Sequence, residues 1–122
     1  GHTDTVNALA GTYNANVDAV DELGVTALMY AALKGHTDTV NVLADTHNAN
    51  VEAVDQTGRT TLMIAAELGH SATLNALAGA HNANVDAATQ KGLTALMLAA
   101  ENGHADIVNA LAGTCNANVD AA

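Results

Sequence analysis

Residues 55–70 read DQTGRTTLMIAAELGH, and the recurrence of this stretch decides the fold. Its Gly-x-Thr-x-Leu-Met segment recurs at a constant interval of 34 residues, beginning at Gly24, Gly58 and Gly92. The Gly-His pair that closes the stretch keeps the same interval, beginning at Gly1, Gly35, Gly69 and Gly103. A constant period of this length predicts a chain of stacked structural repeats, each of which is one small supersecondary unit.

The period divides the chain into three full units and one partial unit. The full units are residues 21–54, 55–88 and 89–122, and residues 1–20 match only the second part of a unit. A chain of 122 residues suits one domain of ordinary size. We therefore predict a single domain over residues 1–122.

Each full unit begins with a pattern typical of a short helix. In residues 26–33, Leu28, Ala31 and Ala32 fall at the i, i+3 and i+4 positions and form one apolar stripe. The threonine before each stripe is a suitable N-cap, because its hydroxyl can accept a hydrogen bond from a free backbone N–H group. The predicted N-caps are Thr26, Thr60 and Thr94.

A second helix is predicted after the Gly-His pair. In the first full unit it runs through Val40, Leu43 and Ala44 and ends at Asn48. Asparagine tolerates the left-handed backbone conformation that often ends a helix, and every unit carries it at this position. The rest of each unit, with its Asn, Asp and Gly residues, predicts a long hairpin-like loop.

Helix pairs of this size cannot bury their apolar stripes alone, so neighbouring units are expected to stack into one continuous core. Small aliphatic side chains must build that core, because aromatic residues make up only 2% of the chain. Alanine pairs allow the helices to approach closely, and leucines fill the layers between them. The predicted layers contain Ala31-Ala32, Ala65-Ala66 and Ala99-Ala100, with Leu28, Leu62, Leu96, Leu43, Leu77 and Leu111.

The units resemble the repeats of the ankyrin family. The family pattern D-x-x-G-x-T-P-L-H-x-A-A-x-x-G-H is similar to residues 55–70, and the family element G-A-D-V-N-A is similar to NANVDA at residues 82–87. The resemblance covers essentially the whole chain. It implies an all-α solenoid of stacked helix-turn-helix units that are joined by long hairpin-like loops.

Four features depart from the family pattern. The unit has 34 residues where the family has 33, and asparagine replaces the loop glycine. Alanine or threonine replaces the proline of TPLH, and methionine replaces its histidine, which predicts apolar packing in place of hydrogen bonds between turns. The extra residue falls near the end of the second helix, where we expect local differences. The residues concerned are Ala27, Thr61 and Ala95, then Met29, Met63 and Met97, and around the extra residue Tyr13, His47, His81 and Cys115.

The charge balance disfavours several classes of partner. Three Lys and Arg against 13 Asp and Glu give a formal net charge of −10 at pH 7, so nucleic acid and acidic membrane surfaces are poor partners. No apolar run is long enough to span a membrane. The single cysteine, Cys115, forms no intrachain disulfide, which slightly favours the cytoplasm or another reducing compartment.

The histidines and the cysteine are interpreted as structural. Four histidines belong to the Gly-His turn, where the resemblance implies a structural role, and these are His2, His36, His70 and His104. His47 and His81 lie in successive units, too far apart to share one zinc ion. Cys115 occupies a position that holds Tyr or His in the other units, which indicates a tolerant surface position without a partnered base. We predict no catalytic, cofactor-binding or metal-binding residues, and no enzyme activity.

The resemblance implies a non-catalytic scaffold for protein–protein interaction. Proteins of this family mostly hold other proteins on a concave side, formed by the hairpin tips and the exposed face of the first helices. Leucines at these positions either form an apolar binding surface or pack between units, and the acidic balance favours a basic partner. The predicted contact residues are Glu22, Leu23, Val25, Leu33, Lys34, Gln56, Thr57, Arg59, Glu67, Leu68, Gln90, Lys91, Leu93, Glu101 and Asn102.

An alternative function is that of a structural subunit that associates with itself end to end. Repeat arrays usually need terminal units with polar outer faces, yet Val6 and Leu9 match Val108 and Leu111, as in an internal unit. Such ends can stack head to tail into an oligomer or a filament. The opening unit lacks a first helix, so this stacking leaves a gap. Removal of flanking repeats explains the same pattern, and an engineered array fits the regularity but not the differences among units.

Overall fold

The computed structural model describes residues 17–114 and places them in three stacked helix pairs. The first pair is α2 (Ala27–Leu33) and α3 (Thr37–Asn41), which continues into the π-helical turn η2 (Val42–Thr46). The second pair is α4 (Thr61–Leu68) and α5 (Ser71–Ala78). The third pair is α6 (Ala95–Glu101) and α7 (Ala105–Asn109), followed by the π-helical turn η3 (Ala110–Thr114). The predicted all-α repeat architecture is confirmed.

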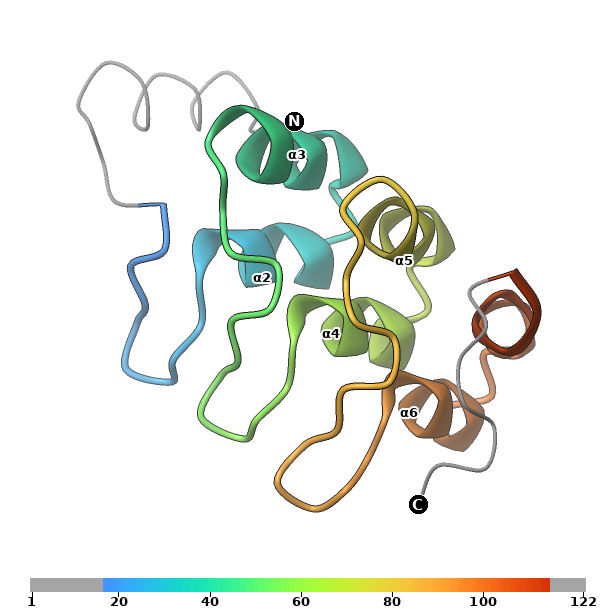
Figure 1. The fold of residues 1–122 in the computed structure, drawn as a ribbon. Coiled ribbons are helices and arrows are strands. Elements are labelled where there is room, and N and C mark those ends of the chain that lie inside the picture. The colour runs from blue at the N-terminus through green and yellow to red at the C-terminus, as the bar shows by residue number, and fades with distance from the viewer. Residues whose placement is uncertain (1–16, 115–122) are drawn as a thin grey trace.

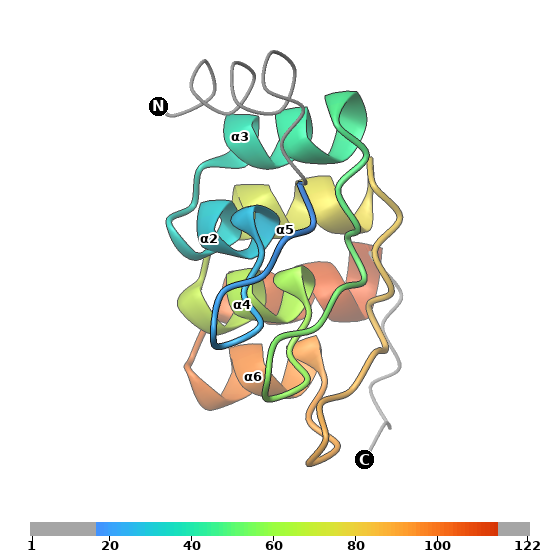
Figure 2. The ribbon, with the colours of Figure 1, turned by 90° about the vertical axis from the view of Figure 1, so that its left-hand side faces the viewer.

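The helices form two layers. The first helices of the units lie in one row, because α2 packs on α4 and α4 packs on α6 (Figure 1). The second helices form the other row, in which α3 contacts α5 and α5 contacts α7. The loops project from the first-helix row as extended hairpins that run side by side (Figure 2). Within residues 17–114 the only β-type pairing consists of the isolated bridges Val54–Thr60 and Ala88–Thr94, at the base of two hairpins.

The predicted N-caps are confirmed in all three first helices. The side-chain oxygen of Thr26 accepts a hydrogen bond from the backbone N–H of Met29 at 3.2 Å. Thr60 and Thr94 accept the equivalent bonds at 3.3 Å, from the third residue of each helix. Each hydroxyl therefore satisfies one of the backbone donors that a helix leaves free at its start.

The end of the second helix differs from an α-helix where the extra residue was expected. The backbone N–H of His47 donates to the carbonyl of Val42 at 3.3 Å, and that of His81 donates to Ala76 at 3.2 Å, five residues back in each case. A turn closed over five residues holds one residue more than an α-helical turn, so it absorbs the additional position of the unit. Asn48 and Asn82 then take φ values of 54° and 53°, which confirms the predicted left-handed ends.

Small aliphatic side chains fill the core as predicted, except in the last unit. Leu28 and Leu62 are buried, whereas their equivalent Leu96 is only half-buried. Ala32 and Ala66 are fully buried, whereas Ala100 is exposed. The reason is that each unit is covered by the next one, and within the described residues no unit follows α6 and α7. Methionine at the TPLH histidine position packs in the core, with Met29 and Met63 buried and Met97 half-buried.

The Gly-His pairs join neighbouring units. Nε2 of His70 donates to the carbonyl of Leu33 in the preceding unit at 3.0 Å, and Nε2 of His104 donates to the carbonyl of Glu67 at 2.9 Å. Each ring lies against the glycine of the preceding pair, where an added Cβ would come within 2.9 Å of His70 or 2.8 Å of His104. The structural role of these two histidines is confirmed, and His2 lies outside the described residues.

The interpretation of the position around the extra residue as a tolerant surface position was wrong for His81. The His81 side chain is only 4% exposed. Its Nε2 lies 2.8 Å from Oδ1 of Asn41, and its Nδ1 lies 3.3 Å from Oδ1 of Asp45. Because α5 packs on α3, His81, which lies three residues after the end of α5, reaches the preceding unit and links the two second helices. Cys115 lies outside the described residues.

Candidate functional site

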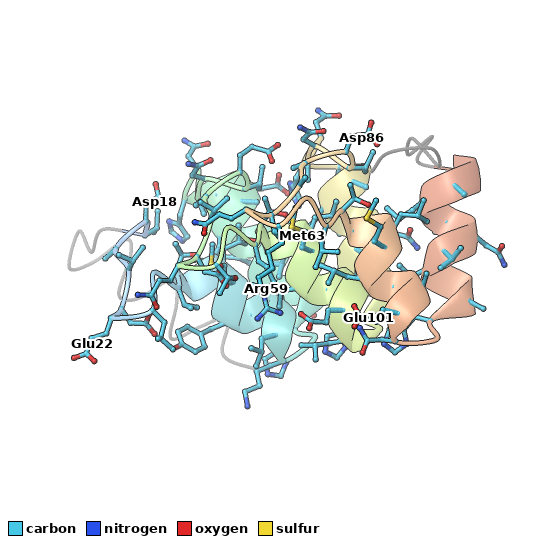
Figure 3. All side chains as sticks on the ribbon, turned by 90° about the horizontal axis from the view of Figure 1, so that it is seen from below. Asp18, Glu22, Arg59, Met63, Asp86 and Glu101 are labelled. Carbon is cyan, nitrogen blue, oxygen red and sulfur yellow. The ribbon has the colours of Figure 1, made fainter. Side chains whose placement is uncertain are left out.

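The predicted contact residues gather on the side of the molecule formed by the hairpin tips and the first helices. Viewed toward this side, Glu22 lies near one end, Glu101 toward the other, and Arg59 between them (Figure 3). Two hollows lie here, one at each junction between units. All but three of the predicted residues line at least one hollow. The three that line neither are Glu22, Lys34 and Asn102.

The apolar hollow lies at the junction of the first two full units and has a volume of about 380 Å³. Four large apolar side chains around it remain accessible to solvent: Leu23 is 60% exposed, Tyr30 47%, Leu68 46% and Leu33 39%. Packing between the units therefore does not account for these three leucines. The full lining consists of Leu23, Val25, Tyr30, Leu33, Asp55, Gln56, Thr57, Arg59, Ile64, Glu67 and Leu68.

Tyr30 is a lining residue that the sequence analysis missed. Its equivalents Ile64 and Leu98 are only 6% and 5% exposed, because α4 and α6 each pack against a preceding first helix. Within the described residues no first helix precedes α2, so Tyr30 remains accessible. The signal in the sequence was that this position varies between units, as the predicted contact positions do, although it lies beside the apolar stripe of the helix.

The carboxylate of Asp21 accepts hydrogen bonds both from the first hairpin and from Tyr30. One oxygen of Asp21 accepts hydrogen bonds from the backbone N–H groups of Leu23 and Val25, each at 2.9 Å. The other oxygen accepts a hydrogen bond from the Tyr30 hydroxyl. The bond from Tyr30 and the backbone bonds lower the pKa of Asp21, and the same carboxylate raises the pKa of Tyr30.

The other two hairpins are held in the same way. Oδ1 of Asp55 accepts from the N–H groups of Thr57 and Arg59 at 2.9 and 3.0 Å and from the Thr57 hydroxyl at 2.7 Å. Burial alone would raise the pKa of Asp55, but these hydrogen bonds and the charge of Arg59 outweigh it and lower the pKa. In the third unit the hydroxyl of Thr89 accepts from the N–H groups of Lys91 and Leu93.

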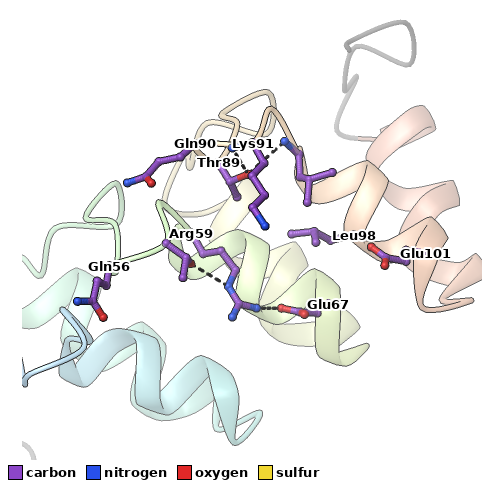
Figure 4. Close-up of a pocket in the computed structure, with 10 residues that line it drawn as sticks. Gln56, Arg59, Glu67, Thr89, Gln90, Lys91, Leu98 and Glu101 are labelled. Atoms are coloured by element: carbon purple, nitrogen blue, oxygen red, sulfur yellow. Dashed lines mark hydrogen bonds and ion pairs between the residues drawn. The ribbon is translucent and has the colours of Figure 1, made fainter.

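The polar hollow lies at the junction of the second and third full units and has a volume of about 410 Å³ (Figure 4). An ion pair between Arg59 and Glu67 stands between the two hollows and lines both. The Arg59 Nε also donates to the Thr57 hydroxyl at 3.3 Å and lies 3.8 Å from an Asp55 carboxylate oxygen. The full lining consists of Gln56, Thr57, Arg59, Glu67, Thr89, Gln90, Lys91, Leu93, Leu98 and Glu101.

Charge is distributed unevenly between the two layers. The three basic residues of the chain, Lys34, Arg59 and Lys91, all belong to hairpins or to the end of a first helix. The described second helices and the segments that follow them carry carboxylates but no Lys or Arg, and these are Asp38, Asp45, Glu52, Asp86 and Asp106. Among them, Glu52 accepts a hydrogen bond from the N–H of Asn84 in the next unit at 2.9 Å. The acidic excess therefore lies mostly away from the hollows.

Residues 17–114 contain no group of three or more His, Cys, Asp or Glu side chains arranged to hold a metal ion. No helix in this part of the chain has the length and apolar character needed to cross a membrane.

Comparison with protein families identifies the repeat. A family model described as ankyrin repeats (3 copies) matches residues 1–89 and 50–122, and the two matches together span the whole chain. The comparison with curated proteins gives no match.

Proposed function

The chain belongs to the ankyrin repeat family, whose repeats generally mediate protein–protein interaction, and we propose that it is a non-catalytic scaffold that binds a protein partner on the side of the two hollows. The observation that carries this proposal is the group of four exposed large apolar side chains around one hollow. An accessible apolar patch of this kind is typical of an interaction surface. Since a fold alone does not determine function, this patch supports the proposal more directly than the repeat architecture does.

The proposed contact residues are the predicted set together with Tyr30. They differ between units while the buried leucines, alanines and methionines stay nearly constant. That contrast is expected where one scaffold carries a surface adapted to a particular partner. The proposed partner is a protein and not a nucleic acid, because 13 acidic residues stand against three basic ones.

Capture from the native source, followed by affinity measurement with the purified partner, tests the proposal. Leu68→Asp introduces a charge at the apolar hollow and is expected to weaken binding at least tenfold. Ala72→Asp introduces the same charge at an exposed position of α5, in the second-helix layer, and is expected to leave binding unchanged. Equal binding by wild type and Leu68→Asp would contradict the proposal.

One observation favours end-to-end self-association as a second candidate function. The glycines Gly35 and Gly69 are each covered by the histidine of the next unit, whereas an added Cβ at Gly103 meets no described atom within 4 Å. A hollow of about 280 Å³ beside it is lined by Ala100, His104 and Val108, among others. On this basis we propose that a Gly-His unit of a second copy packs on this face as His104 packs on Gly69, although residues 1–20 of a second copy would supply only a second helix by their sequence.

Light scattering coupled to size-exclusion chromatography distinguishes this candidate. Self-association predicts a mass that rises with concentration and returns to that of a monomer in Ala100→Asp, which adds a charge to the open face. A monomer at every concentration would exclude end-to-end stacking and leave the partner-binding proposal intact.

A further inference from the structure

Building on the proposed binding function, we infer that the apolar hollow selects the partner by accepting a large apolar side chain that has a basic residue beside it. The polar hollow does not provide this selection. The inference names both the location of the recognition and the chemistry of the segment that is recognised.

The shape and composition of the apolar hollow define the first part of this preference. Leu23, Leu33 and Leu68 expose apolar surface that a partner side chain can remove from water. The volume of about 380 Å³ is large enough for an aromatic or branched aliphatic side chain. Tyr30, one of only two aromatic residues in the chain, adds the kind of side chain that commonly dominates binding energy.

The hollow is organised before any partner arrives. The Tyr30 hydroxyl is bonded to Asp21, which in turn is held by the backbone N–H groups of Leu23 and Val25. The tip of the next hairpin is tied to the first one, because the N–H of Gln56 donates to the carbonyl of Leu23 at 2.9 Å. A wall that is already fixed loses little conformational freedom when a ligand binds.

The charges around the hollow define the second part of the preference. Asp55 lines the hollow, Asp21 accepts the hydrogen bond of the lining residue Tyr30, and Glu22 follows Asp21 in the first hairpin, outside the lining. The one cation that lines the hollow, Arg59, is already paired with Glu67 and lies near Asp55. The lowered pKa values of Asp21 and Asp55 keep both carboxylates ionised near neutral pH. A basic side chain beside the apolar one would meet this negative charge, and a guanidinium can also stack on the Tyr30 ring.

The polar hollow lacks both features. Its apolar lining residues are only Leu93, which is half-buried, and Leu98, which is buried, so no large apolar side chain is exposed there. Lys91 and Glu101 place charges of opposite sign on it. A partner residue of either sign would meet both attraction and repulsion at this hollow.

The test is a nuclear magnetic resonance titration of the ¹⁵N-labelled chain with three blocked dipeptides at millimolar concentration. The dipeptides are N-acetyl-Arg-Trp-amide, N-acetyl-Glu-Trp-amide and N-acetyl-Arg-Ala-amide. The Arg-Trp probe is expected to shift the amide signals of Leu33, Thr57 and Leu68 in a saturable manner. The Glu-Trp probe should bind about fivefold more weakly, because its charge is repelled, and Arg-Ala should give no saturable shift.

Variants assign each part of the preference to its residues. Glu22→Gln is expected to reduce the advantage of Arg-Trp over Glu-Trp while Trp binding persists, and Leu68→Asp is expected to abolish saturable binding of the Glu-Trp probe and weaken that of Arg-Trp. Asp38→Asn removes an exposed carboxylate from α3 in the second-helix layer, outside the proposed contact residues, so it is the control for Glu22→Gln and should change neither affinity. Shifts centred on Lys91 and Glu101, equal affinities for the two Trp probes, or no saturable shift would overturn the inference.

The outcomes also separate this inference from the proposed function. If the native partner is lost by Leu68→Asp but the probes show no preference, the stated chemistry is wrong and the binding side stands. If the native partner binds Leu68→Asp as tightly as wild type, the proposed function itself fails.

Discussion

The two hollows occupy equivalent places in the repeat array, yet one is apolar and the other is polar. Leu23, Tyr30 and Leu68 supply much of the exposed apolar surface of the first hollow. The rest of the difference arises at two positions of each unit, one in the hairpin and one in the first helix. These hold Val25 and Leu33 in the first full unit, the ion pair of Arg59 and Glu67 in the second, and Leu93 and Glu101 in the third. The scaffold beneath them changes little, since every first helix has the same threonine cap and nearly the same buried face. Binding character is therefore set by a few surface positions on a constant framework.

The ion pair contributes to both hollows because it stands between them. Arg59 and Glu67 are partly exposed, and ion pairs in such places contribute little to stability, typically less than about 1 kcal/mol. The main effect of Arg59 and Glu67 is on the polarity of the surface between the two hollows. They prevent the exposed apolar surface of the first junction from continuing into the second.

The largest expected effect on the free energy of unfolding comes from a substitution in the core beneath both hollows. Leu62 is buried in α4, between the two junctions. Leu62→Ala is expected to lower the free energy of unfolding by about 2–5 kcal/mol, because it leaves a cavity in a close-packed layer. Urea unfolding measures this change. Leu68→Ala, on the same helix but exposed, is the control, and equal losses in the two variants would contradict the assigned packing.

A pair of glycine substitutions breaks one junction at a time. Gly35→Ala places a Cβ within 2.9 Å of His70, at the junction of the apolar hollow, and Gly69→Ala places one within 2.8 Å of His104, at the junction of the polar hollow. Each is expected to destabilise the protein by about 2–3 kcal/mol, through the positive φ and the collision together.

Gly103→Ala separates the cost of the positive φ from the cost of the collision with a histidine ring. Its φ is also positive, but no described atom lies within 4 Å of the added Cβ, so a loss of only about 1 kcal/mol is expected. Thermal or urea unfolding of the three variants gives the comparison. If Gly103→Ala is as destabilising as Gly69→Ala, the histidine rings do not pack against the glycines of the preceding units as described.

The carboxylate of Asp55, which lines the apolar hollow, should make the free energy of unfolding depend on pH. The pKa of Asp55 is lower in the folded chain than its ordinary value of 3.8, so its contribution is fully present above about pH 4 and is lost as pH falls through the folded pKa. Asp55→Thr, which copies Thr89 of the third unit, removes this titration. Between pH 5 and pH 3 the free energy of unfolding should fall less in the variant than in wild type. The two losses are expected to differ by less than about 1 kcal/mol. Identical losses in urea unfolding at the two pH values would show that Asp55 is not held as described.

The smallest effect on stability is expected from the double substitution that removes the ion pair between the hollows. Arg59→Val combined with Glu67→Leu gives the second unit the pair found in the first. The free energy of unfolding should change by less than about 1 kcal/mol, because the ion pair is partly exposed. A loss of more than about 2 kcal/mol in urea unfolding would show that the pair supports the fold and not only the surface.

The sequence predicted the scaffold well because the scaffold depends on local chemistry and on periodicity. Thr26, Asn48 and the Gly-His pairs act within one unit or between adjacent units, so their spacing alone defines the repeat. The place of the extra residue was also predictable, although its form as a π-helical turn was not.

The surface was harder to predict because exposure depends on what neighbouring units cover. Tyr30 and Ile64 have the same position in the repeat, yet Tyr30 is exposed and Ile64 is buried, because α4 packs against the preceding first helix α2 and no first helix precedes α2 in the described structure. His81 was taken for a surface residue for the same reason, because its partners Asn41 and Asp45 lie in the preceding unit. The pairing of Arg59 with Glu67 joins a hairpin to a helix, and no local pattern marks it.

The most direct test of the claim that a few surface positions decide what each hollow binds is a titration of the Arg59→Val, Glu67→Leu variant with N-acetyl-Arg-Trp-amide. In wild type, we expect the amide shifts to be confined to the apolar hollow, around Leu33 and Leu68. In the variant, saturable shifts should extend to Leu93 and Leu98 of the other hollow, because the charged wall between them is gone. The same confined pattern of shifts in both proteins would contradict the claim.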